Sequence, residues 1–143
     1  MVQLTNQQKQ KIEKTGKDFD LKLLLIYGSY AKGNQRKDSD LDIAFLGNVP
    51  VDFDGYFRLH SDLADIFGDM ARDLDVVDIY KKDPLFLYQV AKNSQLLYGR
   101  ALDYHEFRAF AFRSYMDSKD IRKLEKILVF RYQNYLDTLY ASR

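Results

Sequence analysis

The residues whose types could do chemistry gather between Gly28 and Asp42. Gly28 and Ser29 close an apolar run, and two carboxylates, Asp40 and Asp42, follow after residues 30–39. A glycine lets the backbone turn sharply and lets a ligand approach, because it carries no Cβ. A helix that begins at the serine would aim free N–H groups at an anion. Mg²⁺ prefers carboxylate oxygens and keeps positions for substrate phosphates. The stretch therefore predicts a site for a phosphate-bearing ligand and a cation.

Two strands must position these groups. Residues 21–27 form a short run of bulky side chains bounded by polar clusters, which predicts a buried strand. Residues 39–46 predict a second strand, in which side chains alternate between two faces. Asp40 and Asp42 therefore share one face, and the apolar residues between and after them face a core. Two neighbouring carboxylates repel each other unless a cation or protons neutralise them, which again indicates a cation.

A third acid would come from the next strand, predicted over residues 74–80. Its candidates are Asp75 and Asp78, which lie three positions apart and so point to opposite faces. At most one of them can join Asp40 and Asp42. Alternation alone does not choose between them.

The order Gly28-Ser29, then Asp40-Leu41-Asp42, resembles the signature of the DNA polymerase β-like nucleotidyltransferases. With Asp38, Ser39 and Ile43 around the acids, the stretch is similar to the minimal nucleotidyltransferase (MNT) branch. The similarity is close to the MntA-type antitoxins, which are partners of HEPN-type toxins. It extends to the chain length and to residues 74–98 and 107–117. The resemblance implies a polymerase β-like fold and nucleotidyl transfer.

The resemblance also implies roles for individual residues. In the family the third acid stands in an apolar–Asp–apolar–apolar pattern, which Asp75 matches and Asp78 does not. Asp40, Asp42 and Asp75 would then be the catalytic acids and would hold two Mg²⁺ ions, about 3.5–4 Å apart as in other two-metal sites.

The phosphate-binding residues follow from the same resemblance. Gly28 and Ser29 would hold the phosphates of ATP, the substrate. Lys32 stands where many relatives carry arginine, so the positive charge is kept and the bidentate fork is lost.

The implied reaction is the transfer of AMP from ATP to a tyrosine hydroxyl of a cognate HEPN ribonuclease toxin, within a toxin–antitoxin complex. Two alternatives stay open: an antitoxin that neutralises by binding alone, and a nucleotidyltransferase of a small-molecule hydroxyl such as an aminoglycoside. The intact Gly-Ser and Asp-x-Asp motifs favour catalysis over binding alone. The small chain has no obvious second substrate domain, which favours a protein acceptor.

Composition sets limits on the kind of protein. A chain of 143 residues predicts a single domain, with a core over residues 1–103 and a C-terminal helical extension over 104–143. The net charge of +1 argues against nucleic-acid binding driven by overall charge. No cysteine is present, so a disulfide framework or thiolate metal site is excluded. We expect a cytoplasmic protein, because no apolar run is long enough for a membrane span and residues 1–20 lack a signal-peptide core.

The remaining pattern predicts the rest of the fold. Helices are expected over residues 6–15, from Asp52 or Asp54 to about 67, and from Pro84 to about 92, and a short edge strand over 96–98. From residue 104 the apolar spacing is helical. The sequence therefore predicts an α+β fold, a small mixed sheet with helices packed on one face plus C-terminal helices.

One further pattern has a plain explanation. Arg100 and His105 superficially match the Arg-x4-His signature of HEPN ribonucleases, but that fold is all-helical and the predicted strands contradict it. The match is therefore attributed to chance.

Overall fold

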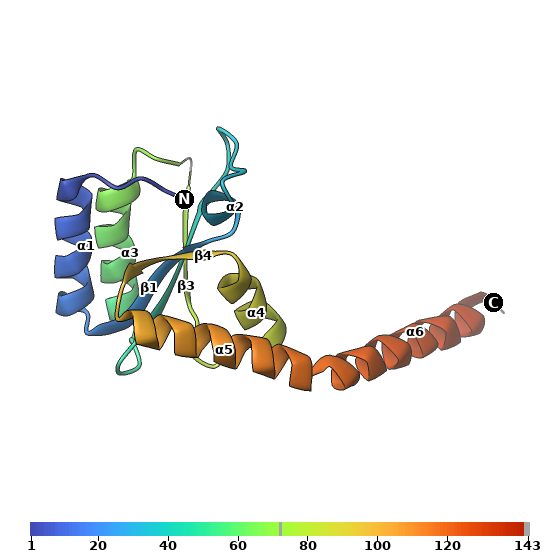
Figure 1. Ribbon diagram of the computed structural model, residues 1–143. Coiled ribbons are helices and arrows are strands. Elements are labelled where there is room, and N and C mark those ends of the chain that lie inside the picture. The colour runs from blue at the N-terminus through green and yellow to red at the C-terminus, as the bar shows by residue number, and fades with distance from the viewer. Residues whose placement is uncertain (72, 142–143) are drawn as a thin grey trace.

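The computed structural model describes residues 1–71 and 73–141. Over these residues the chain forms a four-stranded sheet and six helices (Figure 1). In order, the elements are α1 (Asn6–Asp18), β1 (Leu21–Tyr27), α2 (Ser29–Lys32), β2 (Leu41–Gly47), α3 (Phe53–Phe67), β3 (Leu74–Asp78), α4 (Pro84–Lys92), β4 (Ser94–Tyr98), α5 (Ala101–Asp117) and α6 (Lys119–Ala141).

The sheet is mixed and has the strand order β3-β2-β1-β4. β1 pairs antiparallel with both β2 and β4, whereas β2 and β3 are parallel. A parallel pair needs a crossover connection, and α3 supplies it. The predicted α+β fold class with a small mixed sheet is confirmed.

Helices cover both faces of the sheet, and this is where the structure differs from the predicted arrangement on one face. Leu24 and Ile26 of β1 pack in a core with α1 and α3. Leu23 and Leu25 point the other way, into a second core with α4 and α5. The cause lies in the apolar run of β1, since a strand that is apolar on both sides must be covered on both sides.

The predicted helix starts are confirmed by their caps. Thr5 and Gln8 form a reciprocal capping box at α1, and Asp52 accepts a hydrogen bond from the Gly55 N–H at α3. Asp83 caps α4 in the same way, with Pro84 in the first turn.

The predicted end of α1 at Thr15 is wrong, because the helix continues through Gly16 to Asp18. Gly16 has a different function in the fold. A Cβ on it would lie 2.5 Å from the ring of Tyr98, so the glycine lets β4 pack closely against α1.

The two C-terminal helices behave differently. α5 buries Tyr104 and Ala111 against the second core, whereas α6 buries no residue and extends away from the body (Figure 1). At their junction the guanidinium of Arg122 lies 3.9 Å from the ring centroid of Tyr115 and donates a hydrogen bond to its carbonyl. Among the described residues, no helix is long and apolar enough to cross a membrane.

Candidate active site

The turn after β1 depends on glycine. Gly28 has φ 74° and ψ −145°, a backbone conformation that residues with a side chain rarely adopt. The short helix α2 begins at Ser29 and is closed by Gly33, which has the left-handed conformation. The Tyr30 hydroxyl donates to the carbonyl of Met70 and fixes α2 to the body. Lys32 is exposed in the last position of α2.

The carboxylates lie next to this turn. Asp42 is the register partner of Tyr27 in β1. It therefore lies across the sheet from the residue that precedes the turn. A Cβ built on Gly28 would lie 2.5 Å from Oδ2 of Asp42. The Asp42 carboxylate therefore occupies the space that a side chain at position 28 would need.

The strand register distinguishes the two candidates for the third acid. Asp75 is the register partner of Asp42 on the parallel strand β3, whereas Asp78 is paired with Phe45 farther along. The neighbours of Asp75 and Asp42 show that both point to the α4–α5 face, since Leu41 and Val76 lie in the opposite core. Asp78 instead accepts a hydrogen bond from the Tyr80 N–H. The structure thus brings Asp75, and not Asp78, beside Asp42.

Negative charge accumulates at this end of the sheet. The pKa of Asp42 is raised by its partial burial, then by the nearby carboxylates of Asp75 and Asp40. Burial, with the charges of Asp42 and Asp75, raises the pKa of Tyr27 to about 12. A bound cation would relieve both effects.

The donor set suits a hard cation such as Mg²⁺, because it consists of carboxylate oxygens. Asp40 and Asp75 are exposed, and Asp42 is half-buried. Over residues 1–71 and 73–141, however, no three acidic or histidine side chains are gathered closely enough to form a ready metal cage. The chemistry of the residues fits a cation, and the two exposed carboxylates would have to turn toward Asp42 to bind it.

Tyr27 is the residue at this site that the sequence prediction missed. It lies in the row formed with Asp42 and Asp75 across three strands and packs edge-on against Phe86 of α4, with ring centroids 6.3 Å apart. Its position could have been found from strand alternation, because Tyr27 shares the parity of Leu23 and Leu25 and immediately precedes Gly28.

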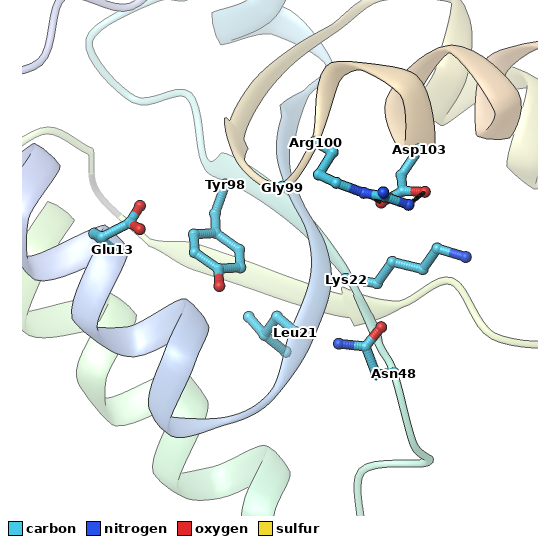
Figure 2. Close-up of a pocket in the computed structure, with 8 residues that line it drawn as sticks. All are labelled: Glu13, Leu21, Lys22, Asn48, Tyr98, Gly99, Arg100 and Asp103. Atoms are coloured by element: carbon cyan, nitrogen blue, oxygen red, sulfur yellow. Dashed lines mark hydrogen bonds and ion pairs between the residues drawn. The ribbon is translucent and has the colours of Figure 1, made fainter.

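A cleft of about 590 Å³ lies at the other end of β1, where Lys22 and Asp103 line it (Figure 2). Arg100 donates two hydrogen bonds to the Asp103 carboxylate, at 2.8 and 2.9 Å, and this pairing lowers the pKa of Asp103. Leu21 lines this cleft, whereas the carboxylate row begins at Tyr27, at the opposite end of the strand. The cleft is therefore separate from the candidate active site.

Comparisons with known proteins identify the family of the chain. The family model described as polymerase beta, nucleotidyltransferase, matches residues 10–103. The protein adenylyltransferase MntA of Aphanizomenon flos-aquae (strain 2012/KM1/D3) is 29% identical over an alignment of 126 residues, and the match covers 81% of this chain and 81% of that protein.

Solved structures give the same result. A toxin–antitoxin structure with AMP-PNP superposes with a TM-score of 0.70 and 27% identity, covering 85% of this chain and 98% of that one. A structure of a tri-AMPylated Shewanella oneidensis HEPN toxin in complex with an MNT antitoxin gives a TM-score of 0.66 and 25% identity, covering 87% and 97%. With the sheet, the glycine turn and the paired carboxylates in place, the chain belongs to the polymerase β nucleotidyltransferase family.

Proposed function

We propose that this protein is an antitoxin that transfers AMP from ATP to a tyrosine hydroxyl of a cognate HEPN ribonuclease toxin and thereby neutralises it. The observation that carries the proposal is the row of Asp42 and Asp75 directly beside the Gly28 turn. Similar proteins are named protein adenylyltransferases, and similar structures are toxin–antitoxin complexes. Because ATP and such a toxin are found in the cytoplasm, we place the protein there.

The residues of the turn would bind the triphosphate. Gly28 gives the turn its positive-φ backbone conformation, and the half-buried Ser29 supplies a hydroxyl and an N–H group at the start of α2. Lys32, one helical turn later, would add a positive charge near the phosphates. Fixed donors of this kind position the α-phosphorus for attack and stabilise the charge that develops on it.

Asp40, Asp42 and Asp75 would hold Mg²⁺, which when bound neutralises phosphate charge and makes a hydroxyl more acidic. In the transfer, the tyrosine oxygen forms a bond to the α-phosphorus of ATP. The bond from that phosphorus to the bridging oxygen of the β-phosphate breaks, pyrophosphate leaves, and the tyrosine proton passes to solvent.

The catalytic core would comprise residues 1–103, and residues 104–143 would form a helical extension of the same domain. The burial of Tyr104 and Ala111 supports a single domain, because α5 completes the second core. α6 has no buried residue, an observation that also favours a contribution of simple binding to neutralisation. One protein can both bind the toxin and transfer AMP to it. A variant of the carboxylates, such as Asp42→Asn, distinguishes the two because it should remove transfer alone.

The test is the intact mass of the candidate toxin after incubation with this protein, ATP and Mg²⁺. We expect a gain of one or more AMP units, absent with Asp42→Asn. An unchanged mass together with a stable complex on a sizing column would support neutralisation by binding alone. If neither appears, small-molecule hydroxyls become the acceptors to screen.

The cation is tested separately from transfer. Adding Mg²⁺ to the wild-type protein should raise Tm, since a ligand at 100 times its Kd stabilises a folded state by about 2.7 kcal/mol. Asp42→Asn should show a much smaller rise. Equal rises in both proteins would mean that Mg²⁺ binds elsewhere.

A further inference from the structure

A groove of about 410 Å³ lies between α4 and α5 on the surface of the second layer. Two small residues, Ala91 from α4 and Ala109 from α5, leave space between the helices. Larger side chains border that space: Tyr88, Lys92, Arg108 and Phe112. The groove is thus bordered by two aromatic rings and two cations.

The aromatic border is held in place. Tyr88 stacks on Tyr115 with ring centroids 4.1 Å apart and planes within 16°, and Arg122 lies over the ring of Tyr115. Phe112 lies 6.4 Å from Tyr88 and is 55% exposed. An exposed phenylalanine beside a fixed tyrosine offers ring surface to a flat ligand.

The charge of the groove has one sign. Among the described residues, Lys92 and Arg108 line it and no carboxylate does. The Lys92 ammonium lies 5.7 Å from the Tyr88 ring centroid, and the Arg108 guanidinium lies 5.6 Å from that of Tyr104. Cations interleaved with aromatic rings suit a ligand that alternates phosphates with bases, because the cations pair with phosphates and the rings stack on bases.

The groove lies on the same face of the sheet as the carboxylates. α4 and α5 cover the face to which Asp42 and Asp75 point. Lys92 ends α4, and Ser94, two residues later, is the register partner of Tyr27. The Lys92 end of the groove is therefore the end nearer to the last residue of β1, which leads into the Gly28 turn.

We propose that this groove binds adenylate units already attached to the acceptor, so that further units can be added. The proposal rests on the proposed function and extends it to successive transfer; one similar structure contains a tri-AMPylated toxin. In each later step a ribose hydroxyl of the attached adenylate forms the bond to the α-phosphorus of the next ATP. The bond to the β-phosphate oxygen breaks, pyrophosphate leaves, and the hydroxyl proton passes to solvent.

Direct binding is measured with a fluorescently labelled, 5′-phosphorylated adenosine trinucleotide by anisotropy. We expect the wild-type protein to bind it with an affinity that falls as salt rises. Ala109→Leu fills the groove without changing charge, and the double variant Lys92→Gln with Arg108→Gln removes its cations; each should weaken binding by about tenfold. The control is Lys11→Gln with Lys14→Gln, which removes two charges from exposed positions of α1 on the opposite layer. Thermal unfolding verifies that every variant is folded.

Successive transfer is followed by the distribution of toxin masses over time. The groove variants should add the first AMP at the wild-type rate and later units about tenfold more slowly. Slowing of the first addition by the same factor would overturn the proposal, because the groove would then contact the toxin itself. Trinucleotide binding that is unchanged in all groove variants would overturn it as well. If the wild type adds no AMP but binds the trinucleotide in the groove, the proposed function fails and the ligand class stands.

Discussion

Gly28 lies directly beside the carboxylate of Asp42 in this structure. The carboxylate of Asp42 lies where a side chain at position 28 would be, 2.5 Å from the ideal Cβ. The strand register fixes this contact, since Asp42 is paired with Tyr27, the residue before Gly28. The glycine of the turn therefore leaves room for the Asp42 carboxylate beside the proposed phosphate site.

The first prediction compares Gly28→Ala with Gly33→Ala. Both glycines have positive φ, 74° and 79°, but a Cβ on Gly33 meets nothing within 4 Å. Gly33→Ala should cost roughly 1–2 kcal/mol through backbone strain alone. Gly28→Ala should cost about 1–3 kcal/mol in backbone strain. It should also displace the Asp42 carboxylate. Urea unfolding and AMP transfer should show that Gly33→Ala keeps activity and Gly28→Ala loses it. Normal transfer by Gly28→Ala would show that the position of Asp42 is not critical.

The second prediction concerns stability and pH at Asp42. Burial and the charges of Asp75 and Asp40 raise its pKa in the folded state, so the folded protein holds this proton more tightly than the unfolded chain. Stability is therefore lost as pH rises from the ordinary aspartate pKa through the raised one. With Mg²⁺ removed, Asp42→Asn should have a higher Tm than wild type at pH 7, and the difference should vanish at low pH. Asp78→Asn is the control. Asp78 accepts a hydrogen bond from the Tyr80 N–H, so removing its charge should not raise Tm. A lower Tm for Asp42→Asn at pH 7 would contradict the prediction.

Local patterns predicted much of the fold. The caps at Thr5, Asp52 and Asp83, and the turn at Gly28, are set by residues near in sequence, and the structure has all four. Alternation predicted that the acids and the core residues point to opposite faces, and Asp42 does point away from the face of Ile43. Asp40 lies just before β2, which begins at Leu41.

Features that depend on distant contacts could not be derived from local spacing. Alternation left Asp75 and Asp78 open, the family resemblance chose Asp75, and the β2–β3 register pairs Asp75 with Asp42. The end of α1 was misplaced because the packing of Gly16 on Tyr98 outweighs the tendency of glycine to end helices. Tyr27 was missed because an aromatic residue in a buried strand is normally only a core residue.

The third prediction tests the α1–β4 contact. Replacing a helical glycine by alanine normally stabilises a helix by up to about 1 kcal/mol. Gly16→Ala should do the opposite, because its Cβ would lie 2.5 Å from the Tyr98 ring. We expect a loss of about 1–3 kcal/mol in urea unfolding, typical of overpacking. The double variant with Tyr98→Leu should recover part of it. A stabilised Gly16→Ala protein would show that β4 and α1 can separate without cost.

The last prediction concerns the Tyr27 hydroxyl. Burial, Asp42 and Asp75 raise its pKa to about 12, so the folded protein keeps this proton after ordinary tyrosines have ionised. Because the folded state holds the proton more tightly, stability should fall as pH rises from 10.0 to about 12. Tyrosinate absorbance should show a late-titrating component that is absent in Tyr27→Phe and present in the control Tyr140→Phe. In Asp42→Asn the same group should titrate earlier, because one of the two charges is gone. A late group unaffected by Asp42→Asn would mean that the charge of Asp42 does not contribute to the raised pKa of Tyr27.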